Sequence, residues 1–189
     1  MDDNKIYERL RYSLRKNDVL NLAEIFSKQP GGVKQLFDLT TNSDNVLAFH
    51  SAWVLEHILI DNPELLQKWL IPIIEAIINT KNMSVQRHYA KIIKCTLESD
   101  VAKDILKLKK HQKKIELLIE VCFEWLINEK TPIAVKAHCM DILMHFAPNN
   151  DWISEELPHI IRLNMIDAGP GIASKSKKLL KKLHSNEAS

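Results

Sequence analysis

Glycine and proline are scarce in this sequence, which has only 4 Gly and 7 Pro among its 189 residues. Both residues interrupt regular structure, and a protein of many strands needs many turns that contain them. Their scarcity favours long helices with short connections and argues against a sandwich or barrel of strands. Apolar residues make up 46% of the chain and charged residues 26%, a balance that argues against disorder.

Cysteine is rare as well, with three residues, Cys95, Cys122 and Cys139, and no C-x-x-C pair. An odd number of cysteines without metal-ligand spacing argues against a disulfide framework and against a zinc site. Each cysteine lies in an apolar stretch that we interpret as helical. We therefore expect them to be small buried side chains in a reducing compartment.

Long apolar runs are missing. The longest, over residues 65–78, contains Lys68, Pro72 and Glu75 and is too short and too polar to span a bilayer. The first residues are charged and lack the apolar region of a signal peptide. From these features we expect a cytoplasmic protein.

Catalytic motifs are also missing: the sequence contains no G-x-S-x-G, no phosphate-binding P-loop and no G-x-G-x-x-G. The eight histidines form no H-E-x-x-H pattern. His50 and His57 would lie on one helix, but about 10 Å apart along its axis, too far to share a metal without further ligands. We expect no enzymatic activity, no cofactor and no metal site.

Start and stop signals divide the sequence into about ten helices. Residues 99–111 are rich in lysine and are expected to be irregular or weakly helical. The expected helices cover residues 4–16, 18–29, 33–40, 44–60, 63–79, 83–98, 112–128, 132–146, 151–166 and 170–184.

Several residues mark where these helices begin. Asn62-Pro63 and Thr131-Pro132 are strong signals, because proline has no N–H and loses nothing at the first helical position. Asp18 is expected to cap the second helix. Either Ser43 or Asp44 is expected to cap the fourth.

Four of the helices share a pattern. Each has a small residue, a large apolar residue three positions later and another seven positions later, which places all three on one stripe. The small residue allows a neighbouring helix to approach, and the larger ones fill the layer between helices. The four sets are Ala52, Leu55 and Leu59; Ala90, Ile93 and Leu97; Cys139, Ile142 and Phe146; and Ser176, Leu179 and Leu183.

Two of the preceding helices contain proline inside an apolar run, over residues 70–74 and 157–161. The helices that follow them carry QRHYA at residues 86–90 and VKAHC at 135–139. These segments resemble the HEAT-repeat family, whose units are two antiparallel helices, the first often kinked in a pattern like L-P-x-L-L and the second opening like V-R-x-x-A-x-x-x-L. The resemblance covers about residues 30–184. The chain departs from it at Ala48-Phe49, where Val-Arg is usual, and in the helix over 112–128, which has no proline.

The resemblance implies an all-α fold, an α-α superhelix of the HEAT-like solenoid type with about five antiparallel helix pairs. We expect one such domain over residues 1–185 and a frayed tail over 186–189. In a stacked array the second helices line one face, usually the concave one. On that face we expect partner-binding residues at −3 and +1 from each small residue: Phe49, Trp53, Arg87, Lys91, Lys136, Met140 and Lys177.

The function that follows is a non-enzymatic binding or scaffold protein whose partner is a macromolecule, most readily an acidic protein. The same positions could instead be ordinary solvated or packed residues. A nucleic-acid-binding protein related to HEAT-like DNA alkyl-base glycosylases is the alternative, with Trp53, Arg87 and Asp141 as the only suitable trio. Lysine outnumbers arginine by 21 to 5, which argues mildly against base recognition.

Two other surfaces stay open. The lysines of residues 103–114 and of the last helix could contact nucleic acid or an anionic membrane surface, but neither segment has aromatic residues for base stacking. Self-association is a further alternative, through the Phe49 and Trp53 end or through Ile6 and Leu10 of the first helix.

Overall fold

The computed structural model describes residues 3–100, 103–166 and 168–187, and side chains for 7–100, 103–166 and 168–183. Within these residues every regular element is a helix, so the all-α fold class is confirmed. The chain divides into two compact units, which we call unit 1 (Met1–Thr96) and unit 2 (Leu97–Ser189). No helix of the described residues is long and apolar enough to cross a membrane.

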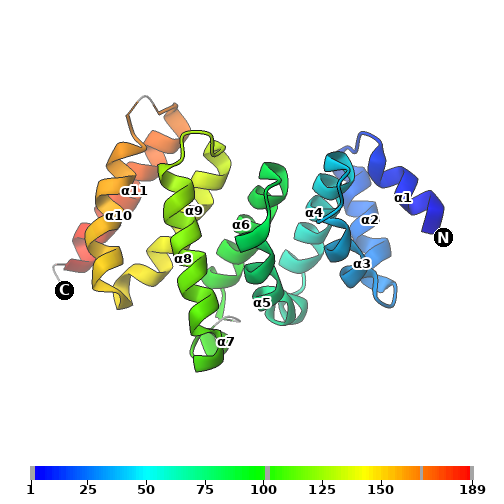
Figure 1. Ribbon diagram of the computed structural model, residues 1–189, viewed down its shortest axis with the longest axis horizontal. Coiled ribbons are helices and arrows are strands. Elements are labelled where there is room, and N and C mark those ends of the chain that lie inside the picture. The colour runs from blue at the N-terminus through cyan, green and yellow to red at the C-terminus, as the bar shows by residue number, and fades with distance from the viewer. Residues whose placement is uncertain (1–2, 101–102, 167, 188–189) are drawn as a thin grey trace. The chain divides into compact units, whose positions relative to one another are not determined.

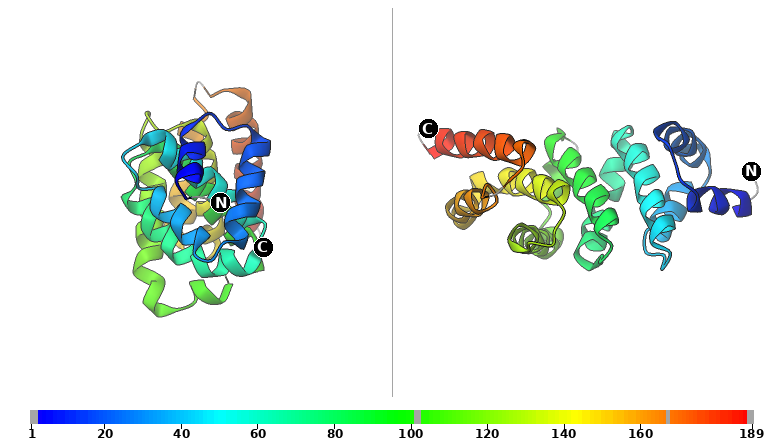
Figure 2. Two further views of the ribbon diagram at one scale, coloured as in Figure 1. Left: turned by 90° about the vertical axis from the view of Figure 1, so that its right-hand side faces the viewer. Right: turned by 90° about the horizontal axis from the view of Figure 1, so that it is seen from above.

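Unit 1 is built around one central helix, α4 (Asn45–Ile60), which contacts α1, α2, α3 and α5 (Figures 1 and 2). Because neighbours cover α4 on several sides, its sequence is apolar around most of its circumference rather than along one stripe. The other helices of unit 1 are α1 (Asp3–Arg11), α2 (Lys16–Lys28), α3 (Gly32–Leu39), α5 (Pro63–Asn79) and α6 (Met83–Glu98), whose last two residues belong to unit 2.

Unit 2 repeats this plan around α9 (Ile133–Phe146), which contacts α8, α10 and α11 (Figure 1). From residue 103 on, the lysine-rich segment forms a short helix and a 3-10 turn, as its irregular composition predicts. The other elements are α7 (Lys103–Leu106), η2 (Lys109–His111), α8 (Gln112–Ile127), η3 (Ala147–Asn149), α10 (Asp151–Leu163) and α11 (Pro170–Glu187).

The column of small residues lies in the core, as predicted. Ala52, Ala90, Cys139 and Ser176 are each fully buried. The large residues three and seven positions later are buried too, except Leu179, which is half-buried. Both interior prolines also lie inside helices, Pro72 in α5 and Pro158 in α10. The repeat pattern read from the sequence is therefore the packing pattern of the helices.

The helix starts agree with the sequence in one case and differ in another. The Asp44 carboxylate accepts hydrogen bonds from the backbone N–H groups of Val46 and Leu47, so Asp44 caps α4. Asp18 lies inside α2 and accepts from the backbone N–H of Arg15, so the prediction that it is the cap residue is wrong. Arg15 is the cap residue, and Asp18 stands at the third helical position. From there its carboxylate accepts the hydrogen bond of the Arg15 backbone N–H.

Three helix ends differ from the prediction. The first helix ends at Arg11 rather than Lys16, and α10 ends at Leu163 rather than Ile166. The frayed tail predicted over residues 186–189 is helical to Glu187, and residues 188–189 lie outside the described residues. The single domain predicted over residues 1–185 stays a prediction.

Candidate partner-binding surface

Two aromatic residues of α4, Phe49 and Trp53, stack on one another in unit 1. They are four positions apart and therefore lie one turn apart on the same side of the helix. Their ring centroids are 5.8 Å apart with an interplanar angle of 16°. His88 of α6 contacts both rings: its ring centroid lies 5.4 Å from that of Phe49 and 6.4 Å from that of Trp53. The two helices thus share one aromatic cluster, formed by Phe49, Trp53 and His88.

A carboxylate, Glu56, is buried beside this cluster with only 3% of the residue exposed. Its Oε2 lies 2.7 Å from His88 Nδ1, and its Oε1 accepts a 2.6 Å hydrogen bond from Lys91 Nζ. A buried charge is tolerated only when it is paired and hydrogen-bonded. Glu56 therefore orients the His88 ring against the aromatic side chains and holds Lys91 in place.

The pKa of Glu56 shows which effect dominates at this position. Burial by itself raises the pKa of the carboxyl, because it disfavours the charged form. The hydrogen bonds and positive charges of His88 and Lys91 together outweigh burial and lower the pKa below its ordinary value. Glu56 is therefore a carboxylate at neutral pH.

The two basic residues predicted for unit 1 differ in their surroundings. The charge of Lys91 is offset by Glu56, although 39% of the Lys91 side chain is exposed. Arg87 is exposed, and no carboxylate among the described residues lies within 4.0 Å of its guanidinium. Arg87 is thus the better placed of the two to meet an acidic partner.

A hollow of about 440 Å³ adjoins the aromatic cluster at the start of α4 and α6. Phe49 lines it together with Val46 and Met83, which are each 46% exposed. Asn82 lies between the two helices: its Nδ2 donates to Asn45 Oδ1 over 3.2 Å, and its Oδ1 caps α6. The hollow offers apolar surface one turn away from Arg87.

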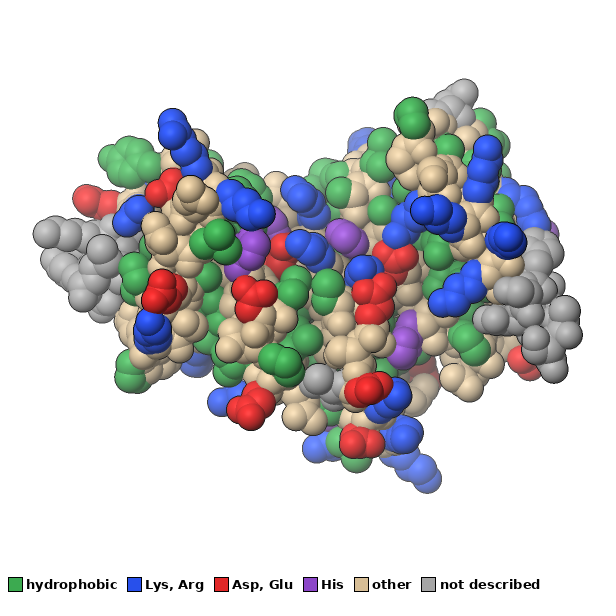
Figure 3. All heavy atoms as spheres, turned by 180° about the vertical axis from the view of Figure 1, so that it is seen from behind, with side chains coloured by type: hydrophobic (Ala, Val, Ile, Leu, Met, Phe, Trp, Pro, Cys, Tyr) green, Lys and Arg blue, Asp and Glu red, His purple; other side chains and the backbone are tan. Residues whose placement is uncertain are grey.

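In unit 2 the three residues predicted to bind a partner differ in their exposure to solvent. Lys177 of α11 is exposed. Lys136 is half-buried, and its Nζ donates to the backbone carbonyl of Leu126 over 3.1 Å. Figure 3 shows exposed basic side chains in blue.

Met140 is fully buried, so its prediction as a surface residue is wrong. Its sulfur lies 3.9 Å from the Ser176 hydroxyl, which donates to it. The +1 position faces outward in α4, but α9 has α11 packed against it there and α8 and α10 on its other sides. Leu10, predicted as a self-association contact, is fully buried as well, and the Ile6 side chain lies outside the described residues.

The side chains that could take part in catalysis interact with other residues of the chain. His50 Nδ1 lies 2.7 Å from the Leu10 carbonyl oxygen, and Asp141 accepts a 2.6 Å hydrogen bond from Lys175. Burial, together with the neighbouring Cys122 thiol, raises the pKa of Cys139 well above its ordinary value, so its thiolate is scarce. No group of three or more His, Cys, Asp or Glu that could hold a metal occurs among the described side chains.

Sequence reasoning missed Glu56. The available signal was a single acidic residue inside an otherwise apolar helix, since a carboxylate there needs a partner from another element. Its partners lie 32 and 35 residues away along the chain, so the pairing itself could not be predicted from one sequence.

Comparison with known proteins gives a family and several similar solved structures. The family described as HEAT repeat domain matches residues 6–183. No curated protein matches the sequence. Similar solved structures include an engineered protein with 17% identity, a TM-score of 0.47 and coverage of 98% of this chain and 99% of that one. A second engineered protein has 15% identity, a TM-score of 0.46 and 98% coverage of both chains. A designed armadillo repeat protein has 12% identity, a TM-score of 0.40 and coverage of 95% and 98%.

Proposed function

This chain belongs to the HEAT repeat domain family, and we propose that it is a non-enzymatic binding protein whose second helices engage a protein partner. In unit 1 the binding surface consists of Phe49, Trp53 and Arg87, with the hollow beside Phe49. In unit 2 Lys177 contributes. Met140 is excluded by burial, and Lys91 and Lys136 are occupied within the chain.

One observation supports this proposal more than any other: an exposed arginine lies one turn from a hollow lined in part by apolar residues and close to a stacked Phe–Trp pair. Tryptophan and arginine are enriched among the residues that contribute most to protein interfaces. The surface also needs little ordering on binding, because Glu56 already fixes His88 against the aromatic pair. A fixed surface loses less side-chain entropy when a partner docks.

The chemistry of the surface indicates the kind of partner. Arg87 and Lys177 are exposed cations, while Val46 and Met83 present apolar surface. A protein segment with an acidic side chain next to an apolar one would satisfy both features in unit 1. We place the protein in the cytoplasm, because its three cysteines are free thiols and free thiols persist in reducing compartments.

A photo-crosslinking experiment tests the proposal. A benzoylphenylalanine residue replaces Met83, at the hollow, or Leu20 of α2, which is exposed to a similar degree. We expect the Met83 position to crosslink a discrete protein in an extract of the source cells, and the Leu20 position not to. Arg87→Glu should reduce that crosslink at least tenfold, because a central interface arginine contributes about 2 kcal/mol or more.

Lys68→Glu is the matched control, since Lys68 is an exposed cation on α5 of the same unit. It should leave the crosslink intact, and all variants should keep the melting temperature of the parent protein. A crosslink that survives Arg87→Glu, identical products from both positions, or no product from Met83 would each contradict the proposed surface.

A further inference from the structure

A second hollow in unit 1, which we call the polar hollow, is lined mostly by polar side chains. It has a volume of about 340 Å³ and lies where α3, α5 and α6 approach one another. Of the nine described residues that line it, Ala76 is the one without a polar side chain and Lys81 is the one with a charge. The polar hollow therefore offers hydrogen bonds, rather than apolar contact, to a molecule that enters it.

The walls of the polar hollow are held by hydrogen bonds between distant segments. They come from the connection between α3 and α4, over residues 40–44, and from the connection between α5 and α6, over residues 80–82. Asn82 Nδ2 donates to Asn45 Oδ1 over 3.2 Å and joins the two. The buried Gln86 side chain donates through Nε2 to the Thr80 carbonyl over 2.9 Å. The hollow is thus shaped before a ligand arrives, which reduces the entropy lost on binding.

Two hydroxyl groups of the polar hollow belong to buried residues. Thr40 is 3% exposed and Tyr89 is 1% exposed. Thr40 Oγ1 donates its hydrogen to the Phe37 carbonyl over 2.6 Å, so the hydrogen bond between the two hydroxyls is donated by Tyr89. The Tyr89 oxygen keeps its lone pairs and can accept from a ligand. Burial raises the pKa of Tyr89 to about 12, so this group is an uncharged hydroxyl at neutral pH.

Several polar groups around the polar hollow are unused within the chain. Asn42 Oδ1 accepts from the Asp44 backbone N–H over 2.9 Å, and Asn79 Nδ2 donates to the Glu75 carbonyl over 2.9 Å. The other ends of these amides, Asn42 Nδ2 and Asn79 Oδ1, have no hydrogen-bond partner among the described residues, and neither has Thr80 Oγ1. The hollow therefore presents an amide donor, an amide acceptor and a hydroxyl side by side.

Opposite charges are balanced at the polar hollow. Both α3 and α5 end there, and the carboxyl end of a helix carries partial negative charge. The exposed Lys81 ammonium supplies positive charge, and no described carboxylate lies within 4.0 Å of it. The carboxylates that flank the first connection are paired, Asp38 with Lys34 and Asp44 with Arg11. Neither an anion nor a cation meets a surplus of opposite charge, so the lining favours a neutral ligand.

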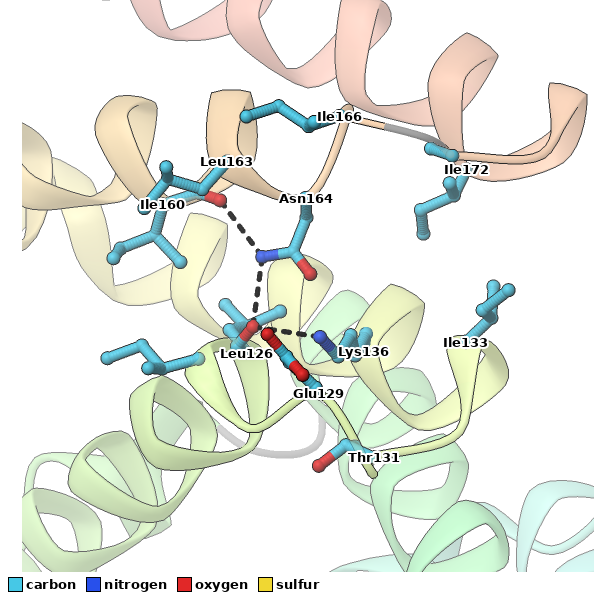
Figure 4. A pocket seen from close by; sticks show the side chains of 12 residues that line it. Leu126, Glu129, Thr131, Ile133, Lys136, Ile160, Leu163, Asn164, Ile166 and Ile172 are labelled. Atoms are coloured by element: carbon cyan, nitrogen blue, oxygen red, sulfur yellow. Dashed lines mark hydrogen bonds between the residues drawn. The ribbon is translucent and has the colours of Figure 1, made fainter.

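The hollow of unit 2 shown in Figure 4 differs in this respect. It has a volume of about 500 Å³ and is lined by the exposed Ile133 and by both Glu129 and Lys136. Lys136 Nζ already donates to the Leu126 carbonyl (Figure 4). Its exposed aliphatic residues and mixed charges favour no one class of ligand.

We propose that the polar hollow of unit 1 binds a neutral polyhydroxyl ligand of about the size of a monosaccharide. A hydroxyl group both donates and accepts, so a ring of hydroxyls can satisfy Asn42 Nδ2, Asn79 Oδ1, Thr80 Oγ1 and the Tyr89 oxygen together. The volume of about 340 Å³ lies at the low end of the range of about 300–1,000 Å³ that is usual for small-ligand sites. A single sugar ring fits that size better than a larger ligand does.

This site is separate from the partner-binding surface. The polar hollow shares Lys81 and Asn82 with the hollow beside Phe49, but neither Phe49 nor Arg87 lines it. The proposal goes beyond the function proposed above and does not rest on it.

Titration calorimetry of the full chain tests the proposal, with glucose, galactose, mannose, ribose and myo-inositol as probes. We expect at least one probe to bind one-to-one, and Thr80→Val to weaken that binding about fivefold, the effect of losing one neutral hydrogen bond. Valine keeps the branched shape of threonine and readily adopts the extended backbone of residue 80, with φ −79° and ψ 131°. Asn79→Ala should weaken binding to a similar degree.

Asn17→Ala is the matched control, because Asn17 is an exposed asparagine on α2 of the same unit. This variant should leave the affinity unchanged, and so should Arg87→Glu, which separates the site from the partner-binding surface. Since the ligand is neutral, its affinity should also be equal at about 50 mM and about 500 mM salt.

Three outcomes would each overturn the proposal. The first is that no probe binds at concentrations up to about 20 mM, where even weak sugar binding is detectable. The second is binding that neither Thr80→Val nor Asn79→Ala weakens. The third is tighter binding of glucose 6-phosphate than of glucose, which would assign the polar hollow to an anion.

Discussion

Glu56 is the residue that connects stability to the candidate surface. Its carboxylate is buried on α4 and holds two residues of α6, His88 and Lys91. Replacing one member of a buried charged network leaves the others without their partner, and that is more damaging than losing a surface ion pair. The same carboxylate sets the position of the His88 ring beside Phe49 and Trp53.

We therefore expect Glu56→Gln to lower the free energy of unfolding at pH 7 by about 2 kcal/mol or more, because it removes the charge that offsets Lys91 and the buried carboxylate that holds His88. The folded-state pKa of Glu56 is lowered. Its stabilising contribution is therefore complete above the ordinary pKa of about 4.5 and is lost as the pH falls through the lower folded value. The difference between parent and variant should shrink between pH 5 and pH 3, measured by urea unfolding.

Glu24→Gln is a suitable comparison, because Glu24 pairs with Lys28 on the exposed side of α2. That substitution should leave the free energy of unfolding nearly unchanged at any pH in the series, because an exposed ion pair contributes little. The buried carboxylate would not have the role assigned to it if Glu56→Gln lowered the free energy of unfolding no more than Glu24→Gln does. The same holds if the effect of Glu56→Gln were equal at pH 3 and pH 7.

Single residues were predicted well where local chemistry decides and poorly where distant packing decides. A side-chain acceptor before an apolar run indicated the cap of α4, but only the structure distinguished Asp44 from Ser43. The position of Met140 relative to Cys139 suggested a surface residue. Which neighbours surround α9 depends on contacts distant in sequence, and those place Met140 in the core.

At the scale of helices, the column of small residues is the strongest link between sequence and packing. All four members are fully buried, as is expected where one helix approaches another closely. The spacing of small and large residues could be read directly from the sequence because it repeats with the helical period. Helix ends such as Arg11 and Leu163 were harder to predict from the sequence, since the last turns depend on packing as well as on local signals.

Ser176 gives a direct test of that column. Ser176→Leu adds two heavy atoms where α11 meets α9, beside Met140. Overpacking of a filled core forces neighbouring side chains and backbone to shift. We expect a loss of about 1 to 3 kcal/mol in unfolding free energy, measured by denaturant titration.

Ser174→Leu is the matched variant, because Ser174 is an exposed serine two residues earlier on the same helix. Leucine favours helix slightly more than serine, so this change should be neutral or weakly stabilising. Equal effects of the two substitutions would mean that the small residue at position 176 is not needed for helix approach, and the repeat register would have to be assigned differently.

At the scale of the whole molecule, the sequence predicted the helical class and the family, but only part of the surface. The helical spacing of apolar residues recurs along the chain, and so does the proline inside a helix. These two recurring features indicated the helical-repeat fold. The hollow beside Ile133 escaped prediction, since Ile127, Ile133, Leu163 and Ile166 come from four separate segments that only tertiary packing brings together. Patches formed by loops and helix ends have no period from which they could be recognised.

The sequence leaves open whether the basic residues of the molecule bind nucleic acid. Several lysines are paired with carboxylates, among them Lys91 with Glu56, Lys103 with Asp100 and Lys175 with Asp141. Trp53 already stacks with Phe49 and His88. The net charge of the chain is only +2. These features favour a protein partner over a nucleic acid.

We therefore expect no detectable binding of the full chain to a duplex of about 20 base pairs at about 50 mM salt, where phosphate contacts are strongest. A protein that uses its lysines on the phosphate backbone would bind under those conditions and lose about 10³-fold or more in affinity by about 200 mM salt. Fluorescence anisotropy across that range distinguishes the two cases. If binding were seen, Lys177→Glu would identify the surface, because loss of one phosphate contact reduces the slope of log affinity against log salt by about 1. Tight, salt-sensitive binding that Lys177→Glu weakens would replace the protein-partner proposal for unit 2, whereas weak binding that ignores salt would leave it intact.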